Sequence, residues 1–187
     1  MPTTDALDRI TEAWGRQQPG LDTSAMALFG RIHLISRMAG DRMERLYGRF
    51  AVSRADFDLL AALRRGGEPF RLSPRQLSVA MMITTGGTTG RLDRLERAGL
   101  VRRLPDGRDR RCLQVELTAE GLRMVDQAML SGLADQQSLL AGFAAEDLQQ
   151  LTEALRAVLR AIGEAAAGAQ ETMAGHPPAM SALTKEQ

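Results

Sequence analysis

The sequence predicts a mainly helical protein that carries one small β-hairpin. Apolar residues recur at helical spacing along most of the chain. Two of the expected helices are separated by only a few residues, which is typical of a helix-turn-helix. Directly after them, two short alternating stretches at 101–104 and 113–117 flank a charged turn. This order of elements is that of a winged helix-turn-helix, here with additional helical regions on both sides.

Residues 1–20 are expected to form an extra N-terminal helix. Leu7, Ile10 and Trp14 lie at positions i, i+3 and i+7, so they share one apolar face. Trp14 is the only tryptophan. Its simplest role is to anchor this helix against the rest of the protein.

The regions that flank the helix-turn-helix are expected to form a helical dimer interface. Residues 21–52 hold one long helix, and residues 121–166 hold two more, each with an apolar stripe. Together they expose more apolar surface than one small domain can cover, which predicts a homodimer. Residues 167–187 lack periodicity and are expected to be disordered.

Residues 53–120 contain the expected DNA-binding unit. Ser73 and Gln76 have capping-box spacing around a helix that begins at Pro74. The second helix is expected over 86–98 and ends at Gly99. Taken alone, this second helix also fits an ordinary amphipathic helix whose arginines face the solvent. The hairpin that follows it favours DNA binding instead.

The expected DNA contacts come from the second helix and the hairpin tip. Small, hydroxylic and basic residues near a helix N-terminus allow close approach to phosphates and base edges. From Ser73 to Leu117 there are nine arginines and five acidic residues, although the whole chain has a net charge of only +1. The candidate DNA-binding residues are Thr85, Gly87, Thr88, Thr89 and Arg94 in the helix and Arg108, Arg110 and Arg111 at the tip.

The segments LDRLERAGLVRR, DRR and LTAEG, in that order between Leu92 and Gly121, resemble the MarR family of winged-helix regulators. The resemblance extends over residues 21–162. It implies a homodimer that binds a pseudo-palindromic double-stranded DNA operator, usually as a repressor, with the second helix in the major groove. It also implies that Arg110 enters the minor groove while Asp109 and Arg111 support the wing tip.

A candidate ligand site involves Asp58 and Arg91. Asp58 interrupts an otherwise apolar helix, and Arg91 lies beside expected core positions, so each buried charge needs a partner. A purely structural salt bridge is one interpretation. The sequence is also similar to the urate-responsive, PecS-like subgroup of the MarR family at Trp14, Asp58, Arg91 and Arg103, which implies binding of a small anionic aromatic effector such as urate.

Other functions are less well supported. Another phenolic or carboxylate effector fits the same cationic site, and oxidation of Cys112, the single cysteine, is a further alternative. No enzyme motif is recognisable, and with two histidines and one cysteine we expect neither a metal site nor a cofactor. The chain has no recognisable signal peptide or long apolar run, so we expect a cytoplasmic protein without membrane association.

Overall fold

The computed structural model describes residues 4–81, 85–105 and 113–174, with the backbone alone described for 85–88 and 169–174. The chain divides into two compact units, Met1–Gln136 and Gln137–Gln187. Within the described ranges, none of the helices has both the length and the hydropathy of a membrane-spanning segment.

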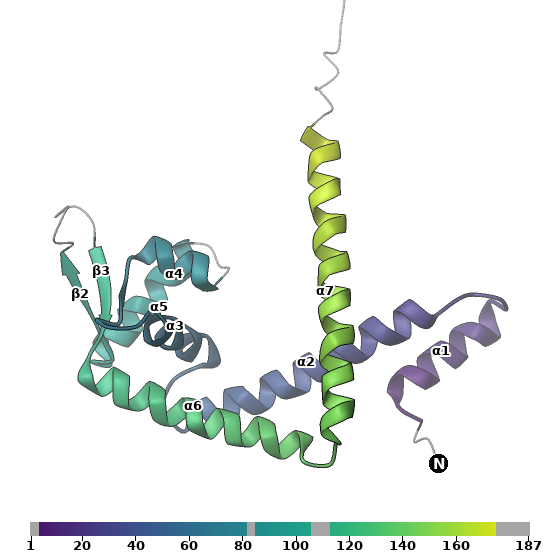
Figure 1. Ribbon diagram of the computed structural model, residues 1–187, viewed down its shortest axis with the longest axis horizontal. Helices are drawn as coiled ribbons and strands as arrows, with labels where there is room; N and C mark the ends of the chain where they lie inside the picture. Colours follow the sequence, from purple (N-terminus) through teal and green to yellow (C-terminus); the bar gives the residue numbers. More distant parts are fainter. Residues whose placement is uncertain (1–3, 82–84, 106–112, 175–187) are drawn as a thin grey trace, which may run out of the picture. The chain divides into compact units, whose positions relative to one another are not determined.

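The described elements confirm a mainly helical fold with a small sheet (Figure 1). In chain order they are α1 (Ala6–Gln17), α2 (Ser24–Gly48), α3 (Arg54–Arg65), β1 (Arg71–Leu72), α4 (Pro74–Met81), α5 (Thr85–Arg97), β2 (Val101–Pro105), β3 (Leu113–Leu117), α6 (Ala119–Leu140) and α7 (Ala145–Ala174).

The N-terminal helix α1 is held on α2 by one buried leucine and an ionic cluster. Leu7 is buried and packs against Gly30, where no Cβ would fit without moving the leucine. Asp5 caps α1 and also accepts a hydrogen bond from Arg31 of α2 at 2.8 Å. Trp14, in contrast, keeps 45% of its surface exposed. The expected anchoring role of Trp14 is therefore wrong for the single chain, because the residues that hold α1 lie nearer its start.

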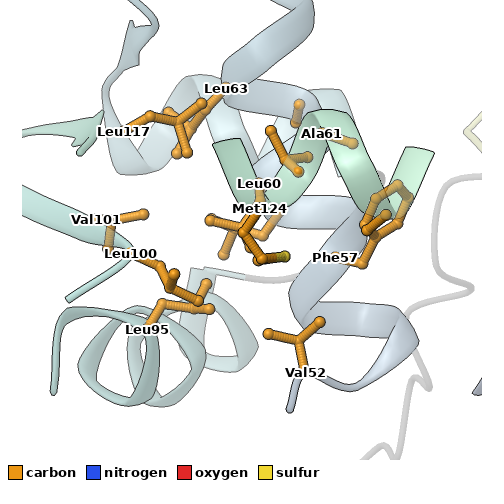
Figure 2. Packing of buried hydrophobic residues seen from close by; sticks show 14 of the residues in the cluster. Val52, Phe57, Leu60, Ala61, Leu63, Leu95, Leu100, Val101, Leu117 and Met124 are labelled. Atoms are coloured by element: carbon orange, nitrogen blue, oxygen red, sulfur yellow. The ribbon is translucent and has the colours of Figure 1, made fainter. Parts of the chain in front are cut away.

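Helix α3 is the centre of the hydrophobic core (Figure 2). Leu59, Leu60 and Leu63 of this helix are completely buried. The rings of Tyr47 from α2 and Phe57 from α3 stack with centroids 4.0 Å apart, which joins the end of the long helix to the core. Leucines from α4 and α5, apolar residues of β2 and β3, and Met124, Val125 and Ala128 of α6 also belong to the cluster.

The sheet has three antiparallel strands in the order β1-β3-β2. The two longer strands are the expected wing hairpin, and Val101 of β2 pairs with Leu117 of β3. The sequence does not predict strand β1. This strand contains only two residues, Arg71 and Leu72, which is too short for an alternating pattern to be recognised.

Helix α6 starts where the wing ends, and its first turn packs against the backbone of Leu100. Thr118 caps the helix by accepting a hydrogen bond from the Gly121 amide, and its hydroxyl donates to the carbonyl of Gly99. A Cβ at position 121 would overlap the carbonyl oxygen of Leu100. Glycine is therefore required by this close approach of two backbones.

Helix α7 continues to Ala174, past the start of the tail that was expected from residue 167 onward. The expectation of disorder is therefore wrong for the first residues of that tail. The surrounding sequence, AAAGAQETMA, is rich in residues with high helix propensity. One glycine costs a helix only about 1 kcal/mol relative to alanine, which these neighbours offset. The rest of the expected tail, residues 175–187, lies outside the described part of the chain.

Replacing Gly121 with alanine is expected to destabilise the protein by about 1–3 kcal/mol, because the new methyl group overlaps backbone that cannot move freely. Gly15→Ala is the matched control, since Gly15 lies in α1 with open space around it. The control should be neutral or stabilising by up to about 1 kcal/mol. Chemical denaturation measures both variants, and equal stabilities would contradict the close packing at Gly121.

Candidate nucleic-acid interface

Helices α4 and α5 form the expected helix-turn-helix. At the start of α4, the Ser73 amide donates to Gln76 Oε1 at 2.8 Å and the Gln76 amide donates to Ser73 Oγ at 3.2 Å, which confirms the capping box. Leu92 and Leu95 bury one face of α5 in the core. Gly99 ends this segment with φ +72°, a conformation that favours glycine.

The N-terminal turn of α5 provides the candidate major-groove contacts. Thr85, Gly87 and Thr88 lie in this turn, where the positive end of the helix dipole favours phosphate. Their side chains are not among those described. Thr89 follows them and is exposed. The wing-tip residues Arg108, Asp109, Arg110 and Arg111 lie outside the described residues, so their expected roles stay predictions.

A buried glutamate joins the three strands at the base of the wing. Glu116 on the central strand β3 accepts hydrogen bonds from Arg102 of β2 at 3.0 Å and from Arg71 of β1 at 3.1 Å. The hydrogen bond from Arg102 is the main reason that the pKa of Glu116 lies below its ordinary value, and the charge of Arg71 acts in the same direction. The ionised carboxylate thus connects both outer strands to the central one.

Arg103 connects the wing to α5. Its guanidinium group donates to Glu96 Oε2 at 2.7 Å and also contacts Asp93, and its backbone amide donates to Glu96 Oε1 at 3.1 Å. Both carboxylates lie on α5, one turn apart. The contacts of Arg103 are therefore with α5 and not with the expected ligand site. They hold β2 against α5.

A second ionic contact holds α5 on α3, and it differs from the expected one. The buried acid of α3 is Asp56, whose side chain is only 6% exposed, and its Oδ1 accepts a hydrogen bond from Arg94 Nη2 at 3.0 Å. Asp58 is exposed and forms no salt bridge in the described part of the chain. The expectation of a buried Asp58 paired with Arg91 is therefore wrong.

The spacing of residues in α3 explains this correction. Asp56, Leu59, Leu60 and Leu63 follow the i, i+3, i+4, i+7 pattern of one helix face, and that face is the buried one. Position 58 falls on the other side of the helix. The exposed position of Asp58 thus follows from the same helical period that buries Asp56.

Asp58 and Arg91 nevertheless lie together, because both line one pocket. This pocket has a volume of about 230 Å³, and α3, α4 and α5 all contribute to it. Among the described residues, those that line it are Asp58, Arg65, Ala80, Met81 and Arg91. The sequence analysis does not include Arg65, although this arginine follows Asp58 by two helical turns and so lies on the same face of α3. That spacing is the signal by which it could have been found.

Trp14 is not part of the pocket that Asp58 and Arg91 share. It lines a separate apolar pocket on α1 with Ile10, Ala13 and Gln17. Of the four residues expected at the ligand site, the structure therefore brings two together and places Trp14 and Arg103 elsewhere.

Comparison with known proteins identifies the family. Residues 52–111 match a model of the MarR family. The chain is 33% identical to the HTH-type transcriptional regulator PecS of Dickeya dadantii over 142 residues, which are 76% of this chain and 86% of PecS. The chain belongs to the MarR family. It is therefore a transcriptional regulator and not an enzyme.

Other known regulators are also similar to this chain. The HTH-type transcriptional repressor YetL of Bacillus subtilis is 27% identical over 135 residues, or 72% of this chain and 80% of YetL. The crystal structure of a mutant MarR from E. coli complexed with operator DNA superposes with a TM-score of 0.64 at 26% identity, covering 74% of this chain and 98% of that one.

The contact between Asp56 and Arg94 is expected to stabilise the attachment of α5 only modestly, because 59% of the Arg94 side chain stays in water. In a double-mutant cycle of Asp56→Ala and Arg94→Ala, measured by chemical denaturation, the double variant should lose less stability than the two single losses added together.

Asp58→Ala is the matched control, on the same helix but exposed. Its stability should stay within about 0.5 kcal/mol of the original protein. If Asp58→Ala cost as much as Asp56→Ala, the assignment of Asp56 as the paired acid would be refuted.

Proposed function

We propose that this protein is a homodimeric repressor that binds a pseudo-palindromic DNA operator and is released from it by a small planar anion such as urate. The observation that carries the proposal is the position of Arg91. This arginine lines a charged pocket with Asp58 and Arg65 and lies on α5, the helix whose N-terminal turn provides the candidate DNA contacts. A ligand at the pocket therefore acts directly on the DNA-reading element.

Operator binding is supported by the family and by the geometry of α5. The related MarR structure was solved with operator DNA. In our proposal, the major groove is contacted by the helix residues Thr85, Gly87, Thr88, Thr89 and Arg94. The minor groove and its phosphates are contacted by Arg108, Arg110 and Arg111 of the wing tip, with Asp109 supporting the tip.

The exposed apolar residues of both units support a homodimer. In the first unit, Ile35 and Met38 of α2 are 66% and 62% exposed. In the second unit, Leu159 of α7 is 70% exposed and Ile162 lies one turn further on. Contiguous apolar helix faces of this kind are usually covered by a partner. A dimer also matches the two half-sites of a pseudo-palindromic operator.

Repression is the proposed mode because the relative YetL carries the name of a repressor. A reporter gene behind the protein's own promoter should then rise in expression when the gene for this protein is deleted. A fall in expression would identify an activator instead.

The ligand mechanism follows from the charges around the pocket. An anionic ligand between α3, α4 and α5 is attracted by Arg65 and Arg91 and repelled by Asp58. When the ligand draws Arg91 toward it, α5 rotates or shifts. The contact of Arg94 with Asp56 and the contact of Glu96 with Arg103 then rearrange as well. If the free protein prefers the DNA-binding conformation over the released one by about 99:1, complete reversal requires the ligand to bind the released conformation more favourably by about 5.5 kcal/mol. Partial release requires a much smaller difference.

Trp14 and Arg103 have different positions in this proposal from those implied by the urate-responsive subgroup. Trp14 lines its own pocket on α1, so it is outside the immediate ligand contacts of the single chain. Arg103 contacts Asp93 and Glu96, so it transmits a movement of α5 to the wing instead of binding the ligand. The ligand contacts that we propose are therefore the three charged residues of the pocket on α3 and α5.

Arg110→Ala is expected to weaken operator binding about tenfold or more, because a minor-groove contact and a positive charge are lost. Fluorescence anisotropy on a labelled duplex from the gene's upstream region measures this change at fixed salt, since salt alone alters the affinity strongly. Arg37→Ala is the control, with the same loss of charge at an exposed position of α2. Equal affinities for the two variants would exclude the wing contact.

Arg91→Ala is expected to keep the dimer and the fold but to lose release by urate, because the ligand then has no attachment on α5. The same anisotropy assay, repeated with increasing urate, gives the concentration for half release. Arg65→Ala should raise that concentration, whereas Arg75→Ala, an arginine of α4 outside the pocket, should leave it unchanged. A normal urate response in Arg91→Ala would refute the pocket assignment while leaving operator binding intact.

A further inference from the structure

A second charged pocket lies between α2 and α6, and it shares no lining residue with the first. It has a volume of about 260 Å³ and is lined by Arg42, Arg45, Leu46, Arg49 and Asp135. The three arginines belong to the C-terminal end of α2 and its cap, and the aspartate belongs to α6. None of these residues has a part in the operator or urate contacts proposed above.

The arginines share one face of α2 because they are spaced at i, i+3 and i+7. Met43 and Tyr47, on another face of the helix, are buried in the core. This burial fixes the rotation of α2 and so directs the arginine face. The direction of the arginine face is thus set by how α2 packs, while the three arginine side chains themselves are exposed.

The charges in the pocket are unbalanced. Arg42 Nε donates to Asp135 Oδ2 at 2.6 Å, and this bond is the main reason that the pKa of Asp135 lies below its ordinary value. Arg49 adds to the same effect through its charge. Arg45 and Arg49 form no salt bridge of their own among the described residues. The pocket therefore carries more positive than negative charge.

We propose that this pocket binds a compact polyanion of the phosphate type. Two guanidinium groups remain after Arg42 is paired, and guanidinium groups recognise phosphate oxygens through paired hydrogen bonds. The volume is slightly below the range of about 300–1,000 Å³ that is typical of sites for larger organic ligands. Leu46 is the only apolar residue among the described residues of the lining, so an extended aromatic ligand would find little to pack against.

The position of the pocket gives the bound anion a regulatory effect. Helix α2 leads directly into α3, and α6 follows directly after the wing. The two helices touch where Tyr47 packs against Gly132 and where Gln136 donates to the sulfur of Met43. An anion held by the arginines beside Asp135 adds charge next to this contact, so it alters the junction that supports the DNA-binding unit.

Isothermal titration calorimetry with pyrophosphate, at constant ionic strength, tests the proposal on the full-length protein. We expect saturable binding to the original protein. The double variant Arg45→Gln/Arg49→Gln should bind about tenfold or more weakly, because charge-assisted hydrogen bonds are lost. Arg37→Gln, an exposed arginine of the same helix outside the pocket, is the matched control and should bind normally. Circular dichroism checks that each variant is folded.

The results of these measurements distinguish a small phosphate ligand from the phosphates of DNA. Saturable binding of pyrophosphate or of a small phosphate monoester that depends on Arg45 and Arg49 supports the proposal, and the tighter of the two identifies the ligand type. Binding that is equal in the double variant and in Arg37→Gln overturns it, as does the absence of saturable binding. Operator affinity that falls in the double variant but does not respond to pyrophosphate in the original protein also overturns it, because the arginines would then contact the DNA backbone and not a small anion.

Discussion

The buried carboxylate of Asp56 is the constraint on which the position of α5, the candidate DNA-reading helix, depends. It lies in the first turn of α3, on the face that carries the buried leucines, and its Arg94 partner comes from α5. A buried charge without a partner is costly, so this pair allows few relative positions of the two helices. The leucines of α5 hold the helix down, and the ion pair selects its position on that apolar surface.

The wing is attached to the same helix by a different arginine. Arg103 contacts two carboxylates of α5, so α3, α5 and β2 are linked in one series of ionic contacts. Glu116 extends the connection to the other strands of the sheet. The arginines of these contacts keep part of their side chains in water, so they can follow a small shift of a partner without exposing the core. This makes them suitable for transmitting the ligand-driven movement that we propose to α5 and the wing.

Two glycines of α6, the helix that follows the wing, allow close contacts with other segments. Gly121 allows the first turn of α6 to rest on the Leu100 carbonyl, and Gly132 allows Tyr47 of α2 to approach α6 closely. Helix α6 is therefore joined by close contacts to the segment after α5 and to the long helix α2. The arginine pocket at Asp135 lies on the second of these joints, which is the basis of the effect on the DNA-binding unit that we propose for an anion bound there.

The sequence by itself indicated most of the helices, the capping box of α4, the two longer strands of the wing and the family, because these depend on spacing within short segments. It also indicated that Asp58 and Arg91 belong to one site. Helical spacing is enough to put Asp56 on the buried face of α3 and Arg65 on the same face as Asp58. Only the tertiary structure decided that Asp56 meets Arg94, that Arg103 contacts Asp93 and Glu96, and that Arg65 and Arg91 line one pocket. Each of these facts depends on which residues, distant in the chain, meet across packed helices and strands, and a local pattern carries no record of that meeting.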